Sequence, residues 1–91
     1  MTKRLHVYIS GRVQGVGFRH WTYIEARSLG LTGWVRNVSG GRVEAEFEGP
    51  APALEQIFQR CHQGPRLAHV QQVQADWIEG EAQYGEFRMR A

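Results

Sequence analysis

The segment over residues 42–49 constrains the fold more than any other part of the chain, because apolar and charged residues alternate along it without interruption. The apolar set is Val43, Ala45 and Phe47, and the charged set is Arg42, Glu44, Glu46 and Glu48. In a β-strand, alternate side chains point to opposite faces of the sheet. Strands of parallel sheets are buried on both faces and lack such alternation. The segment therefore predicts an antiparallel sheet with helices on one side and with these glutamates facing water.

Other segments show strand patterns as well. They cover residues 5–10, 32–37, 68–77 and 87–89. A turn at residues 39–41, which contains two glycines, separates the second strand from the alternating third one. The alternation over residues 68–77 slips between Val70 and Val73, so we expect a β-bulge there.

Helical spacing of apolar residues predicts two helices. The stripe of the first is Phe18, Thr22, Ala26 and Leu29, and that of the second is Leu54, Ile57, Phe58 and Cys61. Gly30 is placed to end the first helix, and Gly64 with Pro65 to end the second. The order of elements is then β-α-β-β-α-β with a short extra C-terminal strand. It predicts one α+β domain over residues 1–91, a ferredoxin-like sandwich with two helices on one face of an antiparallel sheet.

Composition narrows the class of protein. The formal net charge is +2 and the 11 Lys and Arg residues are scattered, which favours a phosphate-sized ligand over a nucleic acid. No stretch has the apolar length of a membrane span or a signal peptide. Cys61 is the single cysteine and lies on an apolar helical stripe, so we expect a small core residue rather than a nucleophile. We therefore expect a cytoplasmic protein, a monomer by default, with no nucleic-acid or membrane partner.

A glycine-rich loop precedes the first helix and ends in an arginine. The loop residues Gly15, Val16, Gly17 and Phe18 lead directly to Arg19. Backbone N–H groups at a helix start point outward, and glycine lets the backbone come close to a ligand. Arg19 would add a planar guanidinium fork for phosphate oxygens. We interpret the loop as an anion cradle, while a purely structural turn before a helix remains the alternative.

Asn37 ends the second predicted strand, at the lip of the glycine turn. It could be an Asx-turn or left-handed residue, or its amide could orient a water molecule by hydrogen bonding. An amide does not bind a proton near neutral pH, so Asn37 could position a water but not deprotonate it. The four histidines lack the spacing of metal ligands, and His20 is expected to point away from its neighbour Arg19.

The two segments together resemble those of the acylphosphatase family. The family's hallmarks read Gly-x-Val-Gln-Gly-Val-x-Phe-Arg and Gly-aromatic-Val-x-Asn-x-x-x-Gly-x-Val-Glu. The first is matched by Gly11, Val13, Gln14, Gly15, Val16, Phe18 and Arg19, and the second by Gly33, Trp34, Val35, Asn37, Gly41, Val43 and Glu44. The resemblance covers nearly the whole chain, although the end of the chain lacks the aromatic last residue common in the family.

The resemblance implies hydrolysis of the carboxyl-phosphate bond of a small acyl phosphate. It assigns phosphate binding to Arg19 and positioning of the attacking water to Asn37. The backbone N–H groups of Gly15, Val16, Gly17 and Phe18 would complete the phosphate site. The departing carboxylate needs no general acid, and phosphoryl transfer requires mainly positioning and charge stabilisation. We therefore expect no cofactor and no metal ion, with the substrate's own phosphate taking the proton of the water.

Two other functions fit parts of the pattern. Acylphosphatase-like domains also form the N-terminal part of the larger hydrogenase-maturation carbamoyltransferases, where they precede Cys-x-x-Cys zinc segments. This chain ends at Ala91 and has one cysteine, so we do not expect a fragment of such a protein. An RNA-recognition module shares the order of elements. It needs exposed aromatic and basic residues on the third strand, where this chain has glutamates that would repel RNA.

Overall fold

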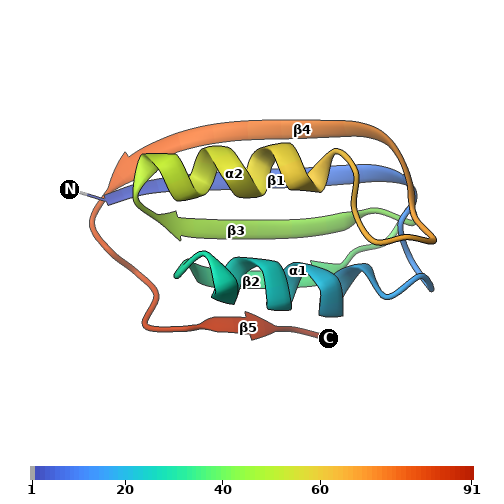
Figure 1. Ribbon diagram of the computed structural model, residues 1–91, viewed down its shortest axis with the longest axis horizontal. Helices are drawn as coiled ribbons and strands as arrows, with labels where there is room; N and C mark the ends of the chain where they lie inside the picture. The colour runs from blue at the N-terminus through green and yellow to red at the C-terminus, as the bar shows by residue number, and fades with distance from the viewer. Residues whose placement is uncertain (1) are drawn as a thin grey trace.

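The computed structural model describes residues 2–91 and contains five strands and two helices (Figure 1). In chain order they are β1 (Thr2–Arg12), α1 (Phe18–Ser28), β2 (Thr32–Asn37), β3 (Val43–Gly49), α2 (Ala51–Cys61), β4 (His69–Gly80) and β5 (Phe87–Met89). The strands form one sheet in the order β4-β1-β3-β2-β5. This is the predicted ferredoxin-like order with its extra C-terminal strand.

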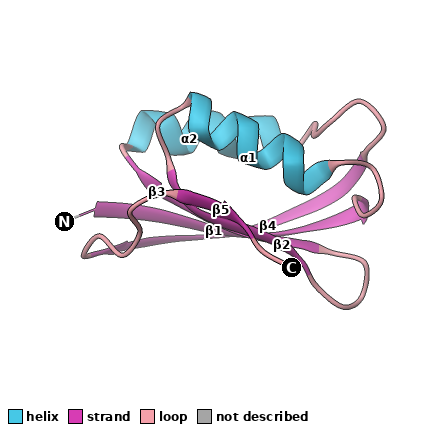
Figure 2. Cartoon of the chain, turned by 90° about the horizontal axis from the view of Figure 1, so that it is seen from below, coloured by secondary structure: helices cyan, strands magenta, loops and turns pink. Residues whose placement is uncertain are grey.

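Both helices cover the same face of the sheet, as Figure 2 shows. The core lies between these two layers, and the apolar positions of the alternating strand β3 are fully buried in it. Each predicted helical stripe supplies core residues, namely Phe18, Thr22 and Ala26 from α1 and Leu54, Ile57 and Cys61 from α2. Neither helix is long and apolar enough to cross a membrane within the described residues.

The predicted bulge in β4 is confirmed by the register of its pairing with β1. Ser10 pairs with Gln72, whereas the next residue, Gly11, pairs with Val70. Gln71 is therefore the extra residue on β4, between the two valines where the alternation slips.

The sheet is antiparallel except at its β5 edge, where β5 pairs in parallel with β2. The chain leaves β4 at one edge of the sheet, reverses direction and reaches the opposite edge through residues 81–86 (Figure 1). Since β4 is antiparallel to β2, a strand that reverses after β4 runs parallel to β2. The purely antiparallel sheet expected from the alternation of β3 is thus a mixed one.

The glutamates of β3 are not in water, contrary to the sequence-based prediction. Glu44 and Glu48 are only 5% and 3% exposed. Neighbouring strands place cations and aromatic side chains against them, so the carboxylates are paired and covered. Alternation shows which residues share a face but not whether that face is covered. The expectation that these glutamates repel RNA therefore loses its basis.

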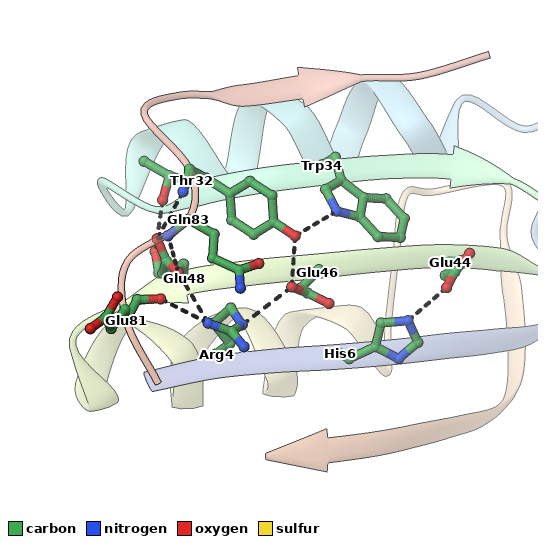
Figure 3. A network of polar contacts seen from close by, with 10 residues as sticks. Arg4, His6, Thr32, Trp34, Glu44, Glu46, Glu48, Glu81 and Gln83 are labelled. Carbon is green, nitrogen blue, oxygen red and sulfur yellow. Dashed lines mark hydrogen bonds and ion pairs between the residues drawn. The ribbon is translucent and has the colours of Figure 1, made fainter. Parts of the chain in front are cut away.

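Glu44 illustrates how the open face of the sheet, the face that the helices do not cover, is stabilised. Its carboxylate accepts hydrogen bonds from His6 Nε2 at 2.6 Å, shown in Figure 3, and from Arg36 Nε at 2.8 Å. Burial acts to raise the pKa of Glu44, but the hydrogen bonds from His6 and Arg36 outweigh it and hold the pKa below its ordinary value of 4.5. The side chain is therefore ionised at neutral pH.

Candidate active site

The glycine-rich loop enters α1 through two residues in left-handed backbone conformations. Gly15 has φ 73° and Gly17 has φ 80°, and a Cβ atom at either position would meet no atom within 4 Å. These glycines are required by backbone conformation rather than by space. Gly17 is the N-cap of α1, and no side chain caps the helix there. The first N–H groups of α1 are thus left for a ligand.

A cavity of about 190 Å³ opens at this helix start. It is lined by Val13, Gly15, Gly17, Phe18, Arg19, His20, Asn37 and Met89. The fold thereby brings together the two candidate residues Arg19 and Asn37 from separate segments, with three of the four loop residues. Val16 is not part of the lining, and its side chain packs against the core.

Arg19 is held from the far end of the chain. Its Nη1 donates to the backbone oxygen of Arg90 at 2.9 Å, and the backbone N–H of Arg90 donates to Val35 in β2 at 2.8 Å. A guanidinium has five N–H donors, so this tether leaves donors for an anion. The tether reduces the conformational freedom that Arg19 loses when it binds a ligand.

Asn37 lies at the end of β2 and pairs with Val43 of β3. No residue other than glycine has positive φ within residues 2–91, so Asn37 is not a left-handed turn residue. Its Oδ1 is buried and has no hydrogen-bond partner among the described residues. A buried acceptor without a partner is unfavourable by about 1–3 kcal/mol. Its place in the lining of the cavity suits an acceptor for a donor molecule bound there.

Gln14 connects the glycine loop to the β2–β3 turn, a function that the sequence pattern did not indicate. Its Nε2 donates to the backbone oxygens of Val38 at 2.8 Å and Arg42 at 2.9 Å. Val38 and Arg42 are themselves joined by a backbone hydrogen bond of 2.9 Å. The side chain therefore fixes the loop that carries Arg19 relative to the strand end that carries Asn37. The signal available in the sequence was the polar Gln14 between the apolar Val13 and Val16.

His20 lines the same cavity as Arg19, which the expectation that it points away from Arg19 did not anticipate. In an α-helix, side chains tilt toward the N-terminus. Adjacent residues of the first turn can therefore both reach a cavity that lies at the helix start. Met89 of β5, which is 46% exposed, lines the cavity as well and was not among the predicted site residues.

Other reactive or metal-binding residue types lie outside this cavity. Cys61 is fully buried in the core, as expected, and burial raises the pKa of its thiol to about 12. No three of the His, Cys, Asp and Glu residues in the described part of the chain lie together as metal ligands. A larger hollow of about 440 Å³ lies against Trp34, Tyr84 and Arg88, but it has no open helix start. The smaller cavity is the better candidate because an arginine, open backbone N–H groups and an unpaired amide oxygen meet there.

Comparison with known proteins agrees with this geometry. A sequence model described as acylphosphatase matches residues 5–89. An acylphosphatase of Salinibacter ruber is 50% identical over 97% of this chain and 93% of its own. The crystal structure of acylphosphatase from Bacillus subtilis superposes with a TM-score of 0.94 at 31% identity, over 98% of this chain and 99% of that one. A structure of full-length HypF in a phosphate- and nucleotide-bound form reaches a TM-score of 0.90 at 28% identity, over all of this chain but 12% of that one.

Proposed function

Because this chain belongs to the acylphosphatase family, we propose that it hydrolyses acyl phosphates to a carboxylate and inorganic phosphate. The observation that carries the proposal is the single cavity shared by the glycine loop, Arg19 and Asn37, whose Oδ1 has no hydrogen-bond partner among the described residues. We also propose that a monomer carries the activity.

The phosphate group binds at the start of α1. The backbone N–H groups of residues 15–18 donate to its oxygens, and the helix dipole favours its negative charge. Arg19 approaches from the same helix and adds a charged, planar pair of donors. Its tether to Arg90 holds the guanidinium in place before the phosphate binds.

Asn37 positions the water molecule that attacks the phosphorus atom. Its Oδ1 accepts a hydrogen bond from that water and directs the oxygen lone pair toward the phosphate. The water oxygen forms a bond to phosphorus while the bond between phosphorus and the acyl oxygen breaks. The amide of Asn37 cannot take a proton, so the proton of the water goes to a phosphate oxygen of the substrate.

The leaving group makes further catalytic groups unnecessary. A carboxylate is the conjugate base of an acid whose pKa is about 4, so it departs at neutral pH without protonation. The remaining requirement is to position the reactants and stabilise charge, as for other phosphoryl transfers. Arg19, the backbone N–H groups and Asn37 meet it, and we propose that no metal ion or cofactor takes part.

Hydrolysis of benzoyl phosphate by the purified chain tests the proposal. We expect turnover that persists in excess EDTA, together with no turnover of p-nitrophenyl phosphate, a phosphomonoester with a poorer leaving group. A folded chain that binds inorganic phosphate but does not turn over benzoyl phosphate would refute the proposed hydrolysis. Turnover that disappears in EDTA and returns with Mg²⁺ or Zn²⁺ would overturn the metal-free mechanism.

A further inference from the structure

Residues 81–86, which lead from β4 to β5, are held by a group of side chains on the open face of the sheet. We call Glu46, Glu48 and Tyr84 the carboxylate clamp. The carboxylate of Glu48 accepts hydrogen bonds from the backbone N–H of Gln83, at 3.0 Å to both oxygens, and from that of Tyr84 at 3.2 Å. Figure 3 shows Gln83 above Glu48. A connection without secondary structure is thereby fixed to the sheet through a buried side chain.

The side chain of Tyr84 makes the second half of the carboxylate clamp. Its hydroxyl donates to Glu46 Oε1 at 2.7 Å and accepts from Trp34 Nε1 at 3.1 Å. Arg4 supports both halves, since its Nε lies 3.3 Å from Glu46 Oε1 and its Nη1 lies 3.7 Å from Glu48 Oε2. The same Nη1 donates to the backbone oxygen of Glu81 at 3.0 Å. These contacts join the connection to three strands of the sheet, β1, β3 and β2.

The pairing of strand β5 within the sheet is short. It has three residues and pairs only with β2. On the side of the connection, Gly33 N–H donates to the backbone oxygen of Glu86 at 3.0 Å, and within the strand Phe87 stacks on Phe47. Directly after β5 comes Arg90, whose backbone oxygen accepts from Arg19. A continuous path of contacts thus leads from the carboxylate clamp to the guanidinium in the cavity.

We propose that the carboxylate clamp positions Arg19 for phosphate binding, by fixing β5 and with it the backbone oxygen of Arg90. Tyr84 and Glu48 are then positioning residues that lie outside the cavity and do not touch the substrate. The inference rests on the proposed function, because it assumes that Arg19 binds the phosphate. Loosening the clamp frees β5 to move, and Arg19 then has to be ordered at the moment of binding.

Coupling of this kind is reciprocal. If a closed clamp strengthens phosphate binding, bound phosphate must strengthen the closed clamp by the same factor. The backbone N–H groups of Gln83 and Tyr84 report the closed state directly, since both donate to Glu48. Their hydrogen exchange should slow when phosphate binds, although neither residue lines the cavity.

The variant Tyr84→Phe tests the inference with a single lost hydroxyl. We expect the Kd of inorganic phosphate, measured by titration calorimetry, to rise about threefold to fivefold, as for the loss of one part-buried hydrogen bond. The KM for benzoyl phosphate should rise by a similar factor with little change in kcat, because binding rather than reaction is weakened. Arg88→Gln is the matched control, since it breaks an exposed ion pair with Glu86 beside the same strand and should leave both constants unchanged.

Hydrogen exchange of the unmodified protein gives a measurement that needs no variant. With saturating phosphate, exchange at Gln83 and Tyr84 should slow by at least the factor seen in Kd, and by more than at Gly64, whose N–H donates to the backbone oxygen of Arg60 at the end of α2. Unchanged exchange at both amides, or an unchanged Kd in folded Tyr84→Phe, would refute the positioning role while leaving the proposed function intact. A protein that binds no phosphate and hydrolyses no benzoyl phosphate would refute both.

Discussion

Replacing Asn37 by alanine should separate catalysis from stability, because the Oδ1 of Asn37 is buried in the cavity wall and has no protein partner among the described residues. The variant removes the acceptor that we propose directs the attacking water. Losing one positioning hydrogen bond in a preorganised site lowers the rate by about 10²- to 10³-fold, or about 2.7–4 kcal/mol of transition-state stabilisation. In the proposed site phosphate is held by Arg19 and the loop, so its inhibition constant should change little. We therefore expect a lower kcat with unchanged phosphate inhibition.

The expected effect of the same change on stability is small and can even be favourable. Alanine keeps the strand geometry at this position, where the residue pairs with Val43 and has no positive φ. The lost oxygen made no hydrogen bond to the protein, and an unpaired buried acceptor is unfavourable by about 1–3 kcal/mol. We expect the free energy of unfolding in urea to stay within about 0.5 kcal/mol of the original or to increase.

Asn37→Asp is the matched control, since it keeps the size and an acceptor oxygen but places a negative charge beside the anion. It should weaken phosphate inhibition, whereas the alanine variant should not. Two results would refute the reasoning: a folded Asn37→Ala variant with full kcat, or one whose rate loss is matched by a large loss of stability. The first would leave Asn37 as a strand residue only, and the second would make its role structural.

Arg19→Lys keeps the charge but removes the planar fork for phosphate oxygens. Phosphate at 100 times its Kd should stabilise the original protein by about 2.7 kcal/mol and so raise its melting temperature. In a thermal scan of Arg19→Lys this rise should largely disappear. Gly33→Ala should lower the free energy of unfolding by at least about 3 kcal/mol in urea titration, because φ is 134° and the new Cβ would lie 1.9 Å from the backbone oxygen of Glu46. Glu44→Gln should be less stable than the original at pH 7, and the difference should shrink as pH falls below about 4.5. Folding lowers the pKa of Glu44, so the stability that its carboxylate contributes is present above the pKa of the unfolded state and is lost as pH falls through the pKa of the folded state. An equal difference in melting temperature between Glu44→Gln and the original at pH 7 and at pH 3 would contradict this.

The elements of the fold could be predicted because each carries a local periodic signal. The strict alternation of residues 43–49 and the helical stripes of α1 and α2 all lie within one element, as does the slip that marks the bulge at Gln71. Glycines in the loop before Arg19 likewise indicate a conformation that the chain adopts locally. The candidate residues themselves, however, were assigned their roles by resemblance as well as by chemistry.

Features that depend on contacts between distant segments could not be predicted. Period-two alternation is the same for a face in water and for a face covered by charged and aromatic partners, so the burial of Glu44 and Glu48 had no local signal. The parallel pairing of β5 follows from the order of strands rather than from its own three residues. His20 was not expected at the cavity because neighbouring residues on a helix were assumed to diverge, whereas a cavity at the helix start is within reach of both.

The chemistry of an acyl phosphate explains why so small a domain can carry the site. A good leaving group removes the need for a general acid, and in the proposed mechanism charge stabilisation comes from one arginine and backbone N–H groups. What remains is accurate positioning, and the fold supplies it through long-range contacts: Gln14 to the β2–β3 turn, and Arg19 to Arg90 across 71 positions of sequence. Changes that loosen β5 should therefore act on phosphate binding, while changes at Asn37 should act on the rate. A variant outside the cavity that lowered kcat alone would contradict this division.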